Sequence, residues 1–196
     1  SAGTLNCRGA KAISFDGDDD YISVADHSSL DIDGDISLSA WVYVVKELGN
    51  FQTIVSKASG CDNATSPWQM RIASDDKLEF VTGAGVGTGS TTRHSSTNAL
   101  ADGWNHVVIT CDEDDASSVV KYYINGVLDK TQSGSWTSMH TNNNALTLGT
   151  LGPNSCYRSR IVLSDVRIYN KVLTDGGVSA TQTATGEIAT LYNGGS

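Results

Sequence analysis

Residues 104–130, WNHVVITCDEDDASSVVKYYINGVLDK, decide the fold of this chain. The runs WNHVVITC (104–111), VVKYYI (119–124) and VLDK (127–130) are rich in β-branched and aromatic residues, which favour strands. Asn125-Gly126 separates the last two runs, and this dipeptide between strand-like runs is a strong signal for a two-residue hairpin. The acidic stretch 111–117 is typical of a solvated hairpin tip. The region therefore predicts three consecutive antiparallel strands.

Similar patterns recur along the chain at a spacing of roughly ten residues, with Gly, Asp or Asn between them. They are AISF (12–15), YISV (21–24), ISLSAWVYV (36–44), QTIVSK (52–57), WQMRIA (68–73), KLEFVT (77–82), ALTLG (145–149) and RIVLSDVRIY (160–169). Ser74-Asp75-Asp76 predicts a tight hairpin, whereas GEIATLY (186–192) is the one helical pattern and is too short to form a layer. The chain is therefore predicted to be all-β, a two-sheet antiparallel sandwich forming one domain over residues 1–196.

The composition supports this interpretation and excludes some partners. The chain has 20 Gly and 2 Pro, and 18 of its 22 acidic residues are Asp, which favours turns over helix interiors. A net charge of -9 repels nucleic acid and anionic membranes, so neither is an expected partner. No apolar run approaches 18 residues, so membrane insertion is not expected. The opening SAGTLNCRGA lacks signal-peptide features, which favours a mature domain or one excised from a larger multidomain protein.

Four cysteines, Cys7, Cys61, Cys111 and Cys156, are widely spaced and form no C-x-x-C pair. Zinc sites normally show two close ligand pairs, so two disulfides in an oxidising compartment are the better interpretation. Three pairings are possible. We favour Cys61 with Cys156, because both lie in loop-like stretches, which leaves Cys7 with Cys111.

The residues needed for catalysis are present only in scattered positions. Glycosidases need two carboxylates across the scissile bond, and the four Glu residues lie in distant segments. None of the four His residues is accompanied by a G-x-S-x-G elbow. The glycine-rich stretch 83–98 lacks the G-K-[ST] of a phosphate loop and is interpreted as a connection into a polar strand. The prediction is that this chain is not an enzyme.

An ordered set of motifs carries a family resemblance. ISFDGDDDYISV, GDISLSAWVYV, DGWNHVVITCD, YYINGVL, SDVRIYNKVLT and the closing LYNGG follow one another as in laminin-G-like, concanavalin A-like domains, over about residues 10–195. The resemblance implies a jelly-roll sandwich, usually a binding module of secreted or cell-surface proteins, often with a structural calcium. It also implies that Trp41 and Trp104 occupy core positions. Because one fold hosts many functions, it indicates architecture better than ligand.

The resemblance also suggests a calcium site at the turn FDGDDDYI (15–22). Calcium takes six to eight oxygens from carboxylates and carbonyls, and Asp16 matches the Asp of the family's Phe-Asp-Gly. The last strand usually carries two acidic residues, whereas this chain has Ser164-Asp165, and the serine is a weaker donor. The acidic turn 31–35 offers Asp33 as a further ligand. The expected ligands of a structural Ca²⁺ are thus Asp16, Asp33, Ser164 and Asp165.

Sugar binding requires an aromatic platform together with polar groups for the hydroxyls. Trp68 is in phase with Met70 and Ile72 and is expected in the core, with Arg71 on the opposite face. Trp136 lies in the polar stretch 131–144 and is either a sugar platform or a loop anchor. The predicted carbohydrate-binding residues are Trp136, His140, Asn143, Arg71 and His94.

Three functional hypotheses follow from these observations. The first is a carbohydrate-binding or adhesive module, extracellular or on the cell surface, whose partner is a glycan or polysaccharide. The second is a structural or protein-interaction domain without glycan binding. The third, a polysaccharide lyase or hydrolase, needs a cluster such as Arg71, His94 and Tyr157 to converge on one face.

Overall fold

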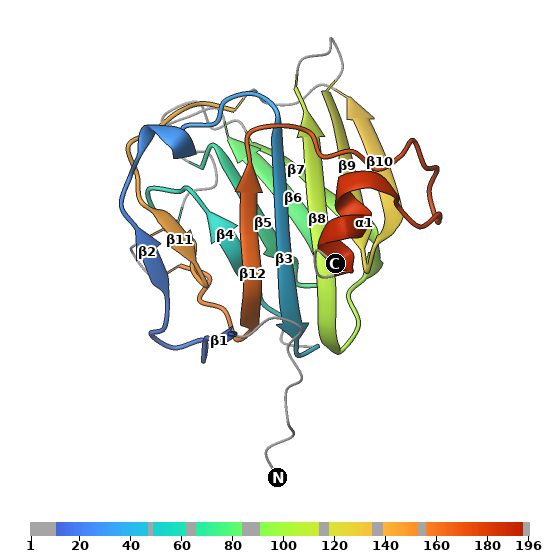
Figure 1. The fold of residues 1–196 in the computed structure, drawn as a ribbon. Coiled ribbons are helices and arrows are strands. Elements are labelled where there is room, and N and C mark those ends of the chain that lie inside the picture. The colour runs from blue at the N-terminus through green and yellow to red at the C-terminus, as the bar shows by residue number, and fades with distance from the viewer. Residues whose placement is uncertain are drawn as a thin grey trace.

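The computed structural model describes residues 11–46, 49–61, 66–83, 91–113, 118–134, 139–152 and 156–193. Twelve strands form two six-stranded antiparallel sheets that pack face to face, as the sequence predicted (Figure 1). We call the sheet that faces the viewer in Figure 1 the front sheet and the other the back sheet. A short helix lies on the outer surface of the front sheet.

The front sheet has the order β1-β12-β3-β8-β9-β10 and the back sheet the order β2-β11-β4-β5-β6-β7. The front strands are β1 (Ile13–Ser14), β12 (Val162–Tyr169), β3 (Ile36–Val44), β8 (Gly103–Asp112), β9 (Ser118–Ile124) and β10 (Val127–Gly134). The back strands are β2 (Ile22–Val24), β11 (Leu146–Leu148), β4 (Gln52–Ser56), β5 (Trp68–Ile72), β6 (Lys77–Gly83) and β7 (Thr91–Ala99). A 3₁₀ turn, η1, covers Ser28–Leu30, and the helix α1 covers Gly186–Tyr192.

The predicted hairpins form where the sequence placed them. Asn125 and Gly126 join β9 to β10 with φ angles of 51° and 76°, the left-handed conformation that a two-residue type I′ turn requires. Asp76 has φ 62° in the turn between β5 and β6, and its N–H donates to the Ala73 carbonyl at 3.0 Å. The polar strand expected after the glycine-rich stretch is β7, whereas residues 84–90 lie outside the described residues.

The core lies between the sheets and follows the two-residue period of the strands. Leu38, Ala40 and Val42 of β3 point inward and are fully buried, as are Met70 and Trp68 of β5. The core position expected for Trp68 is therefore confirmed. Each strand places apolar residues at every second position on its inner side, and these residues account for the face-to-face packing of the two sheets.

Trp41 and Trp104 do not lie in this core, so their predicted core positions are wrong. Trp41 occupies the outward phase of β3 and stacks on Tyr192 of α1, with ring centroids 5.9 Å apart. Trp104 meets Tyr43 edge to face at 5.6 Å, and Trp41, Tyr43 and Trp104 are half-buried. The reason is strand register, since Trp41 is paired with His106 and Tyr43 with Trp104 on the outer side.

The structure pairs Cys61 with Cys156, the pairing favoured from the sequence, with the Cα atoms 5.3 Å apart. The other expected pairing, Cys7 with Cys111, is corrected. Cys111 is a free thiol. Like Val107 and Ile109 of the same strand, it points into the core, and it is 2% exposed. Cys7 lies outside the described residues.

Candidate functional site

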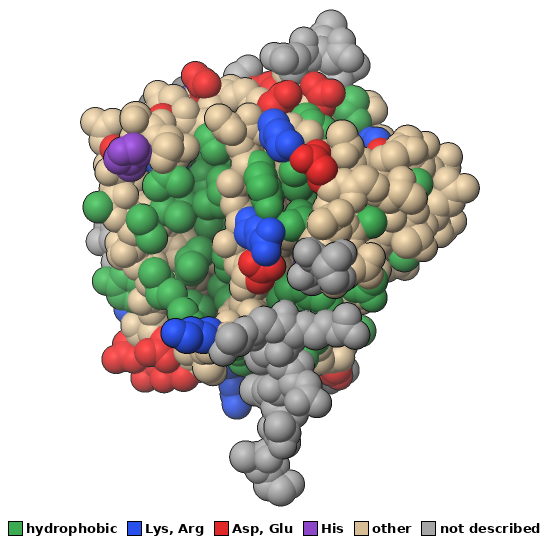
Figure 2. Space-filling view, viewed as in Figure 1, with side chains coloured by type: hydrophobic (Ala, Val, Ile, Leu, Met, Phe, Trp, Pro, Cys, Tyr) green, Lys and Arg blue, Asp and Glu red, His purple; other side chains and the backbone are tan. Residues whose placement is uncertain are grey.

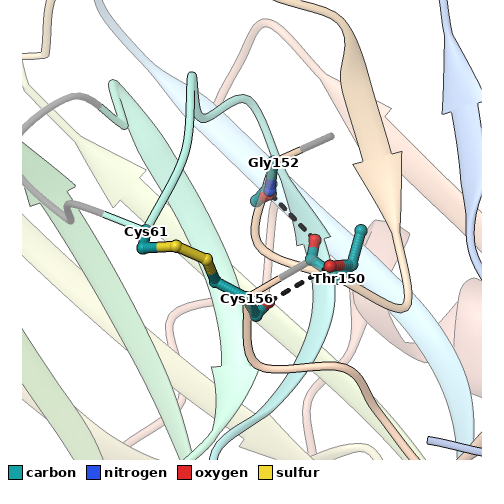
Figure 3. Close-up of a disulfide and its surroundings, with 5 residues drawn as sticks. Cys61, Thr150, Gly152 and Cys156 are labelled. Atoms are coloured by element: carbon teal, nitrogen blue, oxygen red, sulfur yellow. Dashed lines mark hydrogen bonds between the residues drawn. A yellow bond between two sulfur atoms is a disulfide. The ribbon is translucent and has the colours of Figure 1, made fainter. Parts of the chain in front are cut away.

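The outer face of the back sheet is covered over β4, β5 and β6, whereas Arg93 of β7 is exposed. Residues 149–152 and 156–161, which we call the covering segment, run back over β4, where the Gly152 N–H donates to Ser56 and the Ser159 hydroxyl donates to the Thr53 carbonyl at 2.9 Å. The disulfide ties this covering segment to Cys61, and the Thr150 hydroxyl donates to the Cys156 carbonyl at 3.1 Å (Figure 3). As a result, Thr53, Gln69 and Arg71 are completely buried on a face that a groove-binding protein would leave open.

Arg71, one of the predicted carbohydrate-binding residues, is therefore buried beneath this segment. Its guanidinium pairs with Glu79 of β6 and lies 4.1 Å from the centre of the Phe51 ring. Burial lowers the pKa of Arg71 and the neighbouring Glu79 carboxylate opposes that shift, so the cation is retained in the pair. This arrangement stabilises the covering segment and leaves no surface on Arg71 for a ligand.

The hypothetical cluster of Arg71, His94 and Tyr157 does not assemble. The Tyr157 ring lies 5.9 Å from Arg71, but His94 is paired with the inward-facing Phe80 and so lies on the other side of the back sheet. Burial chiefly lowers the pKa of His94, with Lys130 adding to the effect and Glu79 opposing it. Alternation in β6 and β7 thus separates residues that the sequence allowed to converge.

The predicted calcium ligands are also separated by the fold. Asp33 precedes the start of β3, at the upper end in Figure 1, whereas Asp16 follows β1 at the lower end. Ser164 donates to the Lys11 carbonyl at 3.0 Å, and Asp165 pairs with Arg167 at 2.7 Å. The structure therefore does not bring these four residues together.

Asp16 instead forms a cluster with Asp19 and Asp20, in which one carboxylate oxygen of each residue lies within 4.8 Å of the other two. The Asp18 N–H donates to Asp16 Oδ1 at 2.8 Å, and this bond is the main cause of a lowered pKa for Asp16. Gly17 makes the turn possible because its φ is 87° and a Cβ there would meet Arg160 at 3.2 Å. Figure 2 shows the acidic side chains at the lower left of the molecule.

A pocket of about 350 Å³ opens beside this turn, at what we call the lower rim (residues 13–21, 43–46 and 157–162). Its lining combines two aromatic residues, aliphatic side chains, one carboxylate and one guanidinium. The lining residues are Ser14, Phe15, Asp16, Tyr43, Val45, Arg160, Ile161 and Val162. Two further exposed tyrosines belong to the same rim: Tyr21 is 42% exposed, with Arg158 lying 5.8 Å from its ring, and Tyr157 is 40% exposed.

Tyr43 and Arg160 were not among the predicted site residues. Tyr43 lies in the outward phase of β3, and that alternation was a signal that could have identified it. No local pattern identifies Arg160, because its proximity to Asp16 arises where β1 pairs with β12.

Two further predicted carbohydrate-binding residues, His140 and Asn143, lie at the opposite end, which we call the upper rim (residues 25–31, 57–61 and 139–145). His140 Nδ1 lies 2.7 Å from the Gly83 carbonyl and is half-buried, whereas Asn143 is exposed. Trp136 lies outside the described residues. Its role as a sugar platform stays a prediction.

The chain belongs to the concanavalin A-like lectin/glucanases superfamily, whose family model matches residues 16–179. No curated protein shows significant sequence similarity to it. Among solved structures, the chain is similar to the binding domain of Paraclostridial Mosquitocidal Protein 1, with a TM-score of 0.69 and 18% identity, over 96% of this chain and 44% of that one.

Two neurotoxin structures are also similar. The receptor binding domain of botulinum neurotoxin D has a TM-score of 0.64 and 18% identity, over 99% of this chain and 45% of that chain. The structure of botulinum neurotoxin type C, whose cell entry is described as dependent upon interaction with two ganglioside molecules, is also similar. Its TM-score is 0.63 and its sequence identity 20%, over 94% of this chain and 42% of that chain. The chain thus spans less than half the length of these structures, and at such identities the likeness shows the fold alone.

Proposed function

We propose that this chain is a non-catalytic carbohydrate-binding or adhesive module, with its ligand held at the lower rim. The observation that carries the proposal is the pocket in which the Tyr43 ring lies beside Asp16 and Arg160. An aromatic face packs against the C–H face of a sugar, while a carboxylate and a guanidinium bond its hydroxyls. Tyr21 and Tyr157 extend this surface beyond the pocket.

The covered outer face of the back sheet supports a rim site over a groove site. A groove-binding glucanase needs an open sheet face carrying paired carboxylates, and here Glu79 is the one Glu on a described strand and is engaged with Arg71. The toxin domains with a similar fold are binding domains by description, one of them linked to gangliosides. Both points favour binding without catalysis.

We also propose that the module acts outside the cell or on its surface, as part of a larger protein. The Cys61–Cys156 disulfide supports this location, because such bonds persist in oxidising compartments. Within the described residues, no helix combines the length and hydrophobicity needed to cross a membrane.

A glycan array with the intact chain tests the proposal, followed by affinity measurements on two variants. Tyr43→Ala is expected to weaken binding of any selected sugar by at least roughly tenfold, which is about 1.4 kcal/mol. Trp136→Ala removes the other predicted sugar platform and is the comparison; if the ligand is held in the pocket, this variant binds as the parent does. Loss of binding in Trp136→Ala alone would move the site to Trp136 and contradict the pocket.

A structural calcium at Asp16, Asp19 and Asp20 is proposed as well. Three carboxylates within 4.8 Å of one another supply part of the six to eight oxygens that calcium prefers, with carbonyls and water left to complete the shell. Calcium is expected to raise the melting temperature and EDTA to lower it, and Asp19→Asn should abolish the difference. Equal melting temperatures in calcium and EDTA would rule the site out.

The second candidate is a protein-interaction domain, and the half-buried rings on the outer front sheet (Trp41, Tyr43 and Trp104) favour it. A blank glycan array together with capture of a defined protein partner would support this function. The third, a polysaccharide lyase or hydrolase, loses support because His94 and Arg71 face opposite sides. Release of reducing ends from a polysaccharide panel would restore it.

A further inference from the structure

Lys57, the residue after β4, is 0% exposed although its side chain ends in an ammonium group. Five oxygens surround the Nζ atom. They are Asp26 Oδ1 at 2.7 Å, Asp31 Oδ1 at 3.0 Å, the Asn142 carbonyl at 2.7 Å, the Asn144 carbonyl at 3.3 Å and Asn142 Oδ1 at 3.4 Å. A buried ammonium is costly unless it is paired and hydrogen-bonded, and this one has more acceptors than its three N–H groups can use.

The set of oxygens is the kind that binds a hard metal cation. It consists of two carboxylates, two backbone carbonyls and one amide oxygen, which is the ligand chemistry of calcium sites. The three shortest contacts match the three donors of an ammonium, and the other two oxygens add to the negative potential around it. We call these five oxygens the cage. Its two carboxylates carry a charge of minus two, which would balance a divalent ion, and the Lys57 ammonium neutralises one of these charges.

The cage joins three segments that are distant in sequence. Asp26 follows β2, Asp31 follows η1, and Asn142 and Asn144 precede β11. A second link reinforces the junction, because the Asn142 side-chain amide donates to the Lys57 carbonyl at 3.0 Å. The segment held in this way, residues 139–145, also contains His140 and Asn143.

We propose that the Lys57 ammonium is a built-in cation that takes the place of a metal ion and fixes the upper rim. The arrangement of residues 139–145 therefore depends on Lys57 and is independent of added metal. This inference does not rest on sugar binding at the lower rim.

Replacing Lys57 tests the proposal with two variants. Lys57→Met keeps most of the side-chain volume without the charge, and we expect a loss on the order of 10 °C in melting temperature that calcium does not restore. Lys57→Ala opens the cage, and we expect a similar loss in EDTA that added calcium partly reverses. Both are made in an Asp19→Asn background, so that the calcium site proposed at the lower rim contributes nothing.

The two variants give outcomes that decide the matter. A calcium-dependent recovery in Lys57→Ala and none in Lys57→Met supports the built-in cation. The proposal is overturned if either variant has the same melting temperature as the parent. It is also overturned if Lys57→Ala folds and its melting temperature does not change with calcium. If neither variant folds, Asp31→Asn, which keeps the lysine, replaces them. Faster amide exchange at residues 142–144 than in the parent supports the proposal, and unchanged exchange overturns it.

Amide exchange in Asp19→Asn, which keeps Lys57 and lacks the calcium site proposed at the lower rim, provides an independent check. Residues 142–144 should exchange at the same rate in calcium and in EDTA, because Lys57 already supplies the cation. Added protection in calcium would show a metal at this rim and overturn the proposal.

Discussion

His106 lies at an outward-facing position of β8, yet it is only 1% exposed because aromatic rings cover it. The Trp41 and Tyr192 rings have centroids 5.1 Å and 5.8 Å away, and Nε2 lies 3.1 Å from the Ser39 hydroxyl. Burial lowers the pKa of His106 to about 4, with Asp165 opposing the shift and Arg167 adding to it. The neutral imidazole is thus part of the packing between β8 and α1.

His106 is expected to make the protein less stable in mild acid. An unfolded chain takes up this proton near pH 6.5, while the folded chain takes it up only near pH 4. The unfolded state therefore binds more protons between these values, and the free energy of unfolding falls by up to about 3 kcal/mol as the pH drops through this window. Urea unfolding at pH 7.5, 5 and 4 measures this, and His106→Gln should show a shallower pH dependence. Parallel curves for the two proteins would contradict the assignment.

Cys111 is expected to resist alkylation in the folded protein. Burial is the main cause that raises its pKa to about 12, and the nearby acidic residues, Glu113 first, add to this. The thiol is therefore protonated and enclosed at pH 8, and thiolate is the reactive form. Iodoacetamide labelling followed by peptide mass analysis should modify Cys111 only after denaturation. Modification under native conditions at the rate of a free thiol would show that this part of the core opens.

Element by element, the sequence predicted strand positions well wherever alternation was long. The bounds 36–44 for β3 and 186–192 for α1 agree with the structure, because each element has an uninterrupted pattern flanked by turn residues. β10 is longer than predicted, reaching Gly134, since pairing with β9 continues through polar residues. Polar residues carry little periodic signal, and the backbone hydrogen bonds of a neighbouring strand determine their conformation.

The covering segment is expected to depend on the Cys61–Cys156 disulfide for its position. This bond closes a loop with a sequence separation of 95, and breaking such a bond typically costs about 2–4 kcal/mol. The double variant Cys61→Ser/Cys156→Ser is expected to melt at a lower temperature and to be cleaved sooner within residues 150–158 by a protease. Reductant should lower the melting temperature of the parent but leave that of the variant unchanged. Identical cleavage of the two proteins would show that packing of Phe51 and Tyr157 suffices to hold the segment.

At the scale of the whole molecule, charge and architecture limit the partners. A chain with a net charge of -9 presents a repulsive field to polyanions, and the lower rim concentrates three carboxylates at one end. The sandwich buries its apolar residues between two sheets, so its binding surfaces are the rims and the outer front sheet. A ligand must therefore bind by local chemistry at these places.

Nucleic acid binding is expected to be absent at physiological salt. Electrostatic attraction to phosphates supplies most non-specific affinity, and this chain has the wrong sign of charge for it. A gel-shift titration with duplex DNA and with single-stranded RNA should show free probe throughout, with a basic protein as the positive control. A shift that weakens with added salt would reveal a local basic surface that outweighs the net charge.

The sequence by itself determined the all-β architecture, the family, the main turns and the core position of Trp68, because these depend on local periodicity and on ordered motifs. The tertiary structure decided which residues meet. It separated Asp16 from Asp33, enclosed Arg71 beneath the covering segment, placed Trp41 on the outer face and brought five oxygens around Lys57. Sites of this kind are assembled from segments far apart in the chain, and their proximity is set by strand order and register, which no local pattern encodes.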